Sequence, residues 1–233
     1  MSIFTEIQVQ CSKCGADVPF KVVDSVNTTR ELTQPGLRDS ILNHTFQKEK
    51  CPGCEYDFRI EPKFSYVDLK SGQFIGVWPS ANVDECSEYE ARTLEVFKGA
   101  YGSEASPVAQ ELGRRLQPRV VFGWNSLNEK LIAHDAGIDE VTLELAKLAI
   151  VRSGDVFMDS EHQELRLLGV DENLVLGWFA QGSERLNEEV TVSKDILEEI
   201  ESEPEAWQEL RDDLVGGLFV DYRKLFLAVE ATT

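Results

Sequence analysis

Two pairs of cysteines have the spacing of metal ligands. Cys11 and Cys14 form one Cys-x-x-Cys pair, Cys51 and Cys54 form another, and 36 residues separate the two pairs. Thiols at positions i and i+3 of a tight turn can face one point in space. Four thiolates at one point form the tetrahedral site typical of structural Zn²⁺, with Zn–S distances of about 2.3 Å. The sequence therefore predicts one structural zinc ion bound by these four cysteines.

The residues around the cysteines suit tight turns. Gly15 follows the first pair and Gly53 lies inside the second. Both glycines can take positive φ, which would let backbone N–H groups turn toward the sulfurs. The ring of Pro52 fixes its φ at about −65°, which suits the corner of a turn.

The Cys-x-x-Cys motif also occurs in disulfide oxidoreductases, where a single pair lies between a strand and a helix. Here there are two pairs, and Val18, Phe20 and Val22 alternate with polar or small neighbours as in a strand. A thiol-redox or metal-handling protein remains the alternative. A site closed by four thiolates leaves no position for water, so we expect the metal to be structural and not catalytic.

Other residues with reactive side chains form no recognisable catalytic pattern. The histidines His44, His134 and His162 are scattered, and no phosphate-binding or nucleophile motif occurs. Cys86 lies in an acidic stretch that would raise the pKa of its thiol. We predict no catalytic residue, although an enzyme with an unrecognised carboxylate site remains an alternative among 42 Asp and Glu residues.

Negative charge is concentrated away from the cysteine pairs. The net charge is −19, of which residues 1–80 contribute −1, residues 81–180 contribute −9 and residues 181–233 contribute −9. Nucleic-acid binding usually needs a basic surface, so we do not expect it. The acidity either serves solubility or attracts a basic protein partner.

We therefore expect an interaction protein whose acidic C-terminal part binds a basic protein, for example in an immunity or inhibitor-like role against a basic toxin or nuclease. The candidate partner-binding residues are Glu188, Glu189, Glu198, Glu199, Glu201 and Glu203.

The sequence predicts a cytoplasmic protein. No stretch approaches the about 18 consecutive apolar residues of a membrane span, and the first residues do not resemble a secretory leader. Four cysteines in a reduced metal site also agree with a reducing compartment.

Hydrophobic periodicity predicts an α+β protein in two parts. Residues 1–84 are expected to form a zinc-ribbon-like antiparallel sheet, and residues 85–233 an acidic α+β region. That region would contain helices over about 85–152, strands over about 162–180, and acidic C-terminal helices. We expect the Asp and Glu residues of these helices to be solvated, and Asn125 to cap a helix that follows it.

With both cysteine pairs in view, the chain resembles the bacterial CpXC-domain proteins, a family named for two Cys-(Pro)-x-Cys motifs. The likeness extends from about residue 5 to about residue 150, and it includes residues 64–68, 77–79 and 119–131. Ser12 stands where the first motif would have Pro. The resemblance implies a bacterial cytosolic protein with a zinc-binding domain, and it carries no activity over to this chain.

Overall fold

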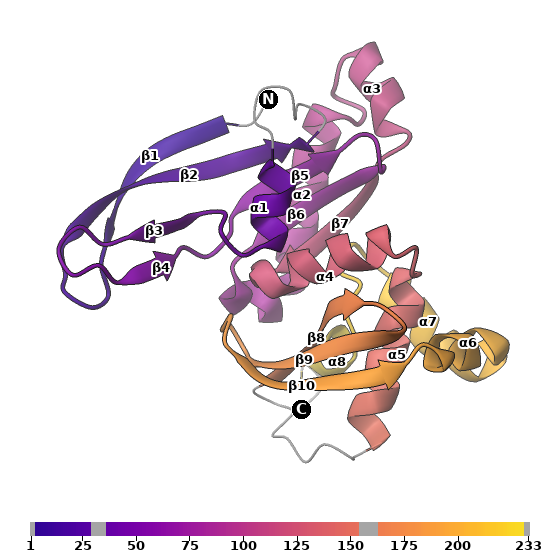
Figure 1. Ribbon diagram of the computed structural model, residues 1–233. Coiled ribbons are helices and arrows are strands. Elements are labelled where there is room, and N and C mark those ends of the chain that lie inside the picture. The colour runs from indigo at the N-terminus through magenta and orange to yellow at the C-terminus, as the bar shows by residue number, and fades with distance from the viewer. Residues whose placement is uncertain (1–2, 29–35, 154–162, 231–233) are drawn as a thin grey trace. The chain divides into compact units, whose positions relative to one another are not determined.

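The computed structural model describes residues 3–28, 36–153 and 163–230, which form two compact units (Figure 1). Unit 1 comprises residues 1–79 and 92–119, and unit 2 comprises residues 80–91 and 120–233. The boundary predicted between residues 84 and 85 lies inside a segment of unit 2. His162, which is also the first residue of the strands predicted over residues 162–180, lies outside the described residues.

The predicted α+β class is confirmed, and helices and strands are mixed in both units. The elements of unit 1 are β1 (Ile3–Gln10), β2 (Asp17–Asn27), α1 (Leu37–Leu42), β3 (Lys48–Lys50), β4 (Asp57–Arg59), β5 (Phe64–Asp68), β6 (Gln73–Trp78) and α3 (Pro107–Gly113). The elements of unit 2 are a 3₁₀ helix (Ser80–Glu85), α4 (Gly123–Asp135), α5 (Glu140–Ser153), β8 (Gln163–Val170), β9 (Asn173–Ala180), β10 (Leu186–Ser193), α6 (Asp195–Ser202), α7 (Pro204–Val215) and α8 (Lys224–Glu230). Residues of both units occur in α2 (Cys86–Ala100) and β7 (Gln117–Phe122).

The main sheet of unit 1 has the strand order β1-β2-β5-β6-β7. β1 pairs with β2 and β5 pairs with β6 in antiparallel fashion, but β2 runs parallel to β5. The sheet is therefore mixed, because the segment that contains α1 and the second cysteine pair connects β2 to β5 and brings the chain back in the same direction.

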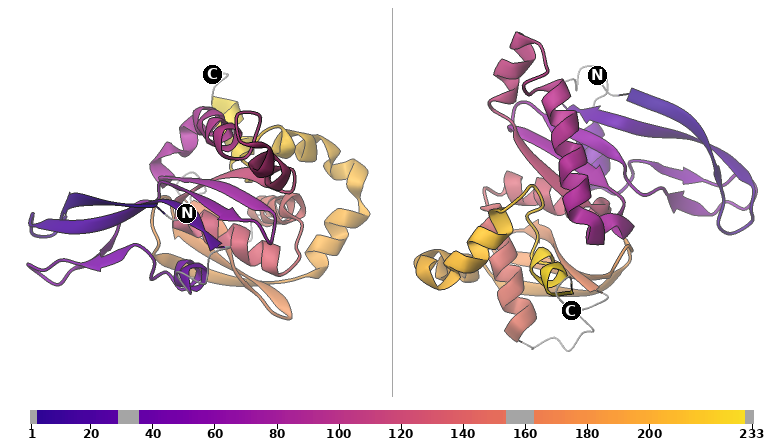
Figure 2. Two further views of the ribbon diagram at one scale, coloured as in Figure 1. Left: turned by 90° about the horizontal axis from the view of Figure 1, so that it is seen from above. Right: turned by 180° about the vertical axis from the view of Figure 1, so that it is seen from behind.

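Two hairpins carry the cysteine pairs at their turns. One consists of β1 and β2, and the other consists of β3 and β4, which form a separate two-stranded sheet. Both views in Figure 2 show the two hairpins side by side with their turns at the same end. In the second hairpin β3 begins only at Lys48, because Gln47 has a φ of 58° and interrupts the extended backbone.

Within unit 1, α2 packs against β6 at a glycine. A side chain on Gly76 would collide with Thr93 of the helix. The Thr93 hydroxyl also accepts a hydrogen bond of 2.9 Å from the Trp78 indole. Further along, Phe74 of the sheet meets Phe97 of α2 edge to face, with ring centroids 5.1 Å apart. These contacts fix one face of the sheet that carries the first hairpin.

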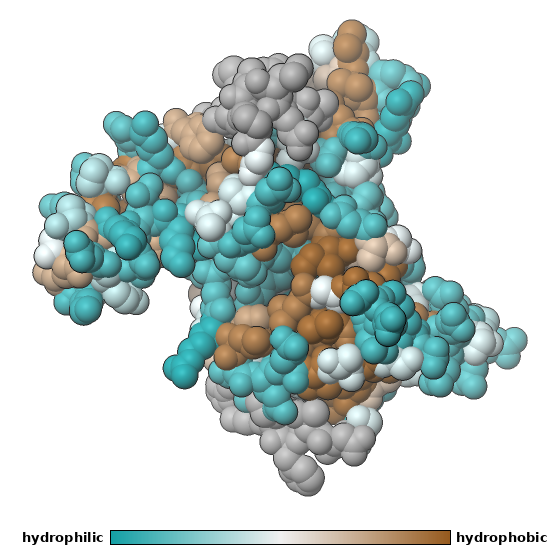
Figure 3. All heavy atoms as spheres, viewed as in Figure 1, coloured by the Kyte–Doolittle hydropathy of each residue, from teal (hydrophilic) through white to brown (hydrophobic). Residues whose placement is uncertain are grey.

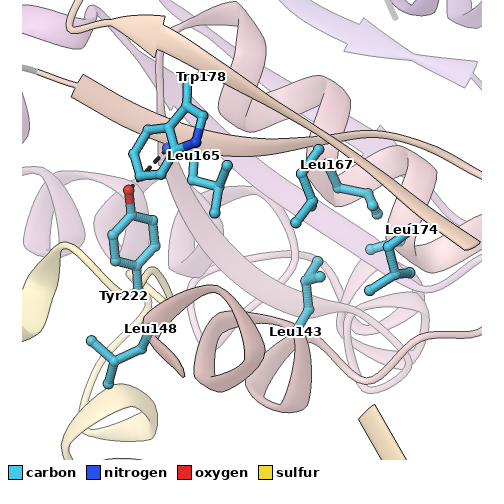
Figure 4. Packing of buried hydrophobic residues seen from close by; sticks show 9 residues of the cluster. Leu143, Leu148, Leu165, Leu167, Leu174, Trp178 and Tyr222 are labelled. Carbon is cyan, nitrogen blue, oxygen red and sulfur yellow. Dashed lines mark hydrogen bonds between the residues drawn. The ribbon is translucent and has the colours of Figure 1, made fainter. Parts of the chain in front are cut away.

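Unit 2 contains a three-stranded antiparallel sheet with the order β10-β9-β8 and a leucine-rich core (Figure 4). Leu165, Leu167 and Leu174 from the sheet lie in one buried cluster with Leu143 of α5. Tyr222 joins the cluster, and its hydroxyl accepts a hydrogen bond of 2.9 Å from the Leu165 N–H. The segment before α8 is thereby tied to the edge of the sheet.

Several carboxylates of the central helices are not solvated, which corrects the expectation from the sequence. Glu129 of α4 and Glu144 of α5 are fully buried, and Lys147 lies between them with N–O distances of 2.7 and 2.8 Å. These residues belong to an ionic cluster of four acidic and four basic side chains that are buried or nearly so, and the partly exposed Glu140 contacts Lys130 at its edge at 3.5 Å. Its members are Glu129, Lys130, Glu144, Lys147, Glu164, Arg166, Asp221 and Arg223.

Arg166 of β8 is the centre of this cluster. Its guanidinium contacts Glu129 at 2.9 Å, Glu164 at 2.8 Å and Asp221 at 2.7 Å. Arg223 contacts the last two of these carboxylates at 2.7 and 3.1 Å. Buried charges are tolerated when each is paired and hydrogen-bonded, and here the pairs connect α4, α5, β8 and the segment before α8.

The same side chains also bind the backbone. The Leu167 N–H donates to Glu129 Oε2 at 2.7 Å, and the Tyr222 N–H donates to Glu144 Oε2 at 2.9 Å. Lys130 Nζ donates to the Val220 carbonyl at 2.6 Å. The cluster thus sets the positions of main-chain segments as well as of side chains.

Asn125 does not cap α4, because the helix begins two residues earlier at Gly123. Its side-chain amide instead donates to the Ser183 carbonyl at 2.9 Å and to Glu164 at 3.4 Å. Its side chain is buried and supports the ionic cluster from the first turn of the helix.

Within the described ranges, no helix combines the length and the apolar composition needed to cross a membrane.

Replacing Lys147 by Met tests how much the buried ionic cluster contributes to the free energy of unfolding. The substitution keeps most of the volume but leaves two buried carboxylates without their common partner, so we expect the free energy of unfolding to fall by about 3–5 kcal/mol. Gln208→Ala is the control in the same unit, because it removes only the exposed hydrogen bond to Asp212 of 2.8 Å. Urea unfolding should show a change of at most about 0.5 kcal/mol for the control. Equal effects of the two substitutions would contradict a structural role for the cluster.

Acid should destabilise unit 2. Burial alone would raise the pKa of the Asp221 carboxyl, but Arg166 and Arg223 hold it well below its usual value. The pKa values of Glu129 and Glu164 are also lowered, because nearby cations outweigh the effect of burial.

Groups with lowered pKa values contribute stability above their unfolded pKa, about 4, and lose it as the pH falls through the folded pKa. Burial raises the pKa of Glu144, whose contribution has the opposite sign, but the three lowered groups outnumber it. We therefore expect the urea midpoint to drop steadily below about pH 4. An unchanged midpoint between pH 5 and pH 3 would contradict this expectation.

Candidate metal site

Four thiols meet at one point in unit 1. The ligand atoms of Cys11, Cys14, Cys51 and Cys54 all lie within 4.8 Å of one another. The Sγ atoms of Cys11 and Cys54 are 3.7 Å apart, and those of Cys14 and Cys51 are 3.5 Å apart. In a tetrahedral Zn–S₄ site with bonds of about 2.3 Å, sulfurs are separated by about 3.8 Å. The structure therefore brings together the predicted ligands at distances that suit one metal ion.

The two cysteine turns have the same backbone hydrogen bonds. The Cys11 N–H donates to the Ala16 carbonyl at 2.9 Å, and the Cys51 N–H donates to the Tyr56 carbonyl at 3.0 Å. Inside each turn, the residue after the second cysteine donates to the carbonyl of the first cysteine, at 2.8 Å in both cases. Each pair is thus held by a closed turn at the end of its hairpin.

Positive φ occurs directly after each second cysteine. Gly15 has a φ of 72° and the equivalent residue Glu55 has a φ of 57°. Gly53, in contrast, does not have positive φ. A Cβ on Gly53 would lie 3.4 Å from the Ala16 side chain and 3.6 Å from Cys14 Sγ, which places the glycine where the two turns approach.

The four thiols differ in exposure. Cys11 and Cys51 are buried and pack with Val18 in a small apolar cluster, to which Phe58 adds its ring. Cys14 is exposed and Cys54 is half-buried. The site therefore has one side against protein and one side open to solvent.

Hydrogen bonding favours one thiolate at the site. Burial opposes the ionisation of Cys11, but hydrogen bonds from the Lys13 and Cys14 backbone and from neighbouring thiols lower its pKa to about 7. The backbone at Ala16 favours ionisation of Cys14, but its hydrogen bonds with the Cys51 and Cys54 thiols raise the pKa of Cys14 to about 12. A cation is needed for all four sulfurs to be thiolates at neutral pH, because each negative charge opposes the next.

Among the described residues, the cluster of possible metal ligands contains the four cysteines and no histidine or carboxylate. His44, seven residues before the second pair, is not one of its members. Cys86 begins α2 and is also separate, and its pKa is raised by burial and by Glu90. The sequence predicted the raised pKa from the acidic neighbours, but burial is the larger cause.

The predicted partner-binding residues are all exposed in unit 2. Glu188 and Glu189 lie on β10, which the sequence analysis missed although Val190 and Val192 alternate along it. Glu198, Glu199 and Glu201 lie on α6, and Glu203 follows that helix. Hydrophilic residues cover this helix in Figure 3. Five of the six residues therefore lie on β10 and α6, and the sixth directly follows α6.

Comparison with known protein families gives one match. The model of the CpXC protein family matches residues 9–147, which include both cysteine pairs and more than half of the chain. No curated protein and no solved structure matches the chain. The chain belongs to the CpXC protein family.

Proposed function

We propose that this chain is a protein-interaction module whose unit 1 is stabilised by one zinc ion and whose unit 2 binds a basic protein through its acidic surface. The observation that carries the proposal is the convergence of four thiols in a ligand cluster to which no histidine or carboxylate of the described residues belongs. Such a ligand set is typical of structural zinc sites, in which the metal contributes folding free energy.

Zinc would be held by Cys11 and Cys14 from one hairpin and by Cys51 and Cys54 from the other. The second hairpin needs such a link, because β3 and β4 have three residues each and the side chains of β3 are all exposed. A two-stranded sheet of this size is marginally stable in water. The metal supplies the connection that apolar packing supplies elsewhere.

The interaction surface is supported by charge. From Asp195 to Asp213 the chain carries nine acidic residues and a single basic residue, Arg211. A field of this sign accelerates association with basic proteins and repels nucleic acid. An inhibitor-like role, in which the chain neutralises a basic target, is one form of the proposed interaction.

The carboxylates of the buried ionic cluster do not support a catalytic proposal. Glu129 and Glu144 are fully buried and are paired with Lys147. They therefore act in folding, and the function is proposed for the surface.

A thiol-redox or metal-handling function is the second candidate. It is favoured by the exposure of Cys14 and the partial exposure of Cys54, which would let an oxidant or a metal acceptor reach one side of the site. The metal content and the oxidation state of the purified chain separate the two functions.

Cys51→Ser tests the structural zinc site, and Cys86→Ser is the matched control because Cys86 lies outside the cluster. We expect one zinc per chain in the wild type and in the control, and less than one in Cys51→Ser. The melting temperature of Cys51→Ser should fall by about 10 °C or more, since 1 kcal/mol corresponds to about 2–4 °C in a chain of this size. Elemental analysis and thermal unfolding measure these effects. A stable, metal-free wild type with a Cys11–Cys14 disulfide would instead support the redox function.

Partner capture should depend on salt. The tagged chain is used to capture proteins from a lysate of the source organism at about 0.05 M and about 0.5 M salt, because higher ionic strength shortens the range of surface charges. A basic protein should be enriched at low salt and lost at high salt.

The charge dependence is tested with two variants that each change six exposed glutamates to glutamine. One variant changes the predicted partner-binding residues, and the other changes Glu6, Glu49, Glu61, Glu95, Glu104 and Glu111 of unit 1. Capture should be lost only in the first variant. Enrichment of no basic protein at low salt, or equal loss in both variants, would contradict the proposed surface.

A further inference from the structure

A pocket of about 380 Å³ opens on unit 2 among α5, α6 and α7. Its apolar lining residues are Ala149, Ile150, Ile196, Ile200 and Trp207. Ile200 is 2% exposed and packs with Leu145 and Leu214, so the floor of the pocket is an extension of the core. The volume is within the range of about 300–1,000 Å³ that ligand pockets occupy. The pocket therefore combines an apolar floor with a volume in the range of ligand sites.

The charged side chains among the described lining residues of the pocket are acidic. Glu199 and Glu203 line it together with Ser153 and Ser202, and no Lys or Arg is among its described lining residues. The two serine hydroxyls donate to backbone carbonyls, of Ile150 at 2.8 Å and of Glu199 at 2.8 Å. Both hydroxyl protons are therefore already used in hydrogen bonds. Glu199 and Glu203 supply the charge among the described lining residues of the pocket.

An apolar floor with carboxylates beside it matches the side chains of arginine and lysine. Their methylene stems bury on apolar surface while the charged heads remain near polar groups. Trp207 adds an aromatic surface, and a guanidinium on a tryptophan ring is a favourable arrangement. An anionic or purely apolar ligand would leave the two carboxylates uncompensated.

We propose that this pocket binds a basic segment of a partner protein, with one Arg or Lys side chain against Trp207 and paired with Glu199 and Glu203. A segment of a protein is favoured over a small cation because the acidic residues continue beyond the pocket along α6 and α7. Further basic residues of the segment would lie over them. This inference rests on the proposed function and names the site within its acidic surface.

The probe is a pool of fluorescein-labelled heptapeptides with a fixed central arginine between two apolar residues, and the control pool has citrulline at the centre. Citrulline keeps the shape of arginine without its charge. Binding to the full, zinc-loaded chain is followed by fluorescence anisotropy. We expect the citrulline pool to bind about tenfold more weakly. The arginine pool should also change the tryptophan emission, and Trp207→Phe should abolish that change.

Two pairs of substitutions separate the pocket from the general field. Glu199→Gln with Glu203→Gln changes the pocket, and Glu188→Gln with Glu189→Gln removes the same charge from β10 of the same unit. We expect about tenfold weaker binding for the first pair and less than about twofold for the second. Ser153→Trp, at an exposed position, fills the pocket without changing charge and should also abolish binding.

The outcomes distinguish this inference from the proposed function. Equal weakening by the two glutamate pairs overturns the pocket and leaves binding by diffuse acidic charge, as does unchanged binding by Ser153→Trp. Binding of N-acetyl-arginine amide as tightly as the peptides overturns the protein segment in favour of a small cation. Equal binding of the arginine and citrulline pools overturns the basic partner itself.

Discussion

The removal of charged side chains from water is the constraint on which unit 2 depends. Glu129, Glu144, Lys147 and Arg166 are each at most 1% exposed, and an unpaired charge at any of these positions would be costly. Because their partners come from two helices, a strand and the segment before α8, the pairs form together only when all four parts are in place. Apolar packing of leucines alone would allow more than one arrangement. We infer that the ionic cluster makes the arrangement unique, at some expense in stability.

Unit 1 depends on a different interaction, the convergence of four thiols from two hairpins. Its second hairpin buries little apolar surface, because the side chains of β3 are all exposed. Among the described residues, the buried members of the apolar cluster at the cysteines are Cys11, Cys51 and Val18. The four thiols, by binding one metal ion, would link the two hairpins, which this small apolar cluster does not hold together by itself. Backbone hydrogen bonds close a turn around each cysteine pair, so that one metal ion bound by the four thiols would join two turns of the same geometry.

The sequence predicts the parts of the structure that depend on local spacing. The cysteine pairs, the hairpin of β5 and β6, and the helix over residues 140–153 are all visible as short-range patterns. The parallel pairing of β2 with β5 is not, because it depends on where a long connection returns. β10 was missed because its acidic residues resemble those of a solvated helix.

The buried ionic cluster could not be predicted from spacing either. Glu129 and Lys130 are neighbours on α4, and both are buried together with nearly all of the helix before them. A helix that is buried on all sides lacks the periodic pattern that separates a solvated face from a core face. The paired helices α4 and α5 each place an acidic and a basic residue in the interior, and only their partners from β8 and the C-terminal segment explain why.

The position of the negative charge bears on the function. The two cluster members within residues 181–233, Asp221 and Arg223, cancel, so the net charge of −9 over that range is carried by residues outside the cluster. On α6 and α7 these acidic residues repel one another, which lowers the stability of the unit. Solubility requires a net charge but does not require that it be concentrated beside an apolar pocket. A basic partner would relieve the repulsion and fill the pocket in the same step, which is why we place the function there and not at the cysteines.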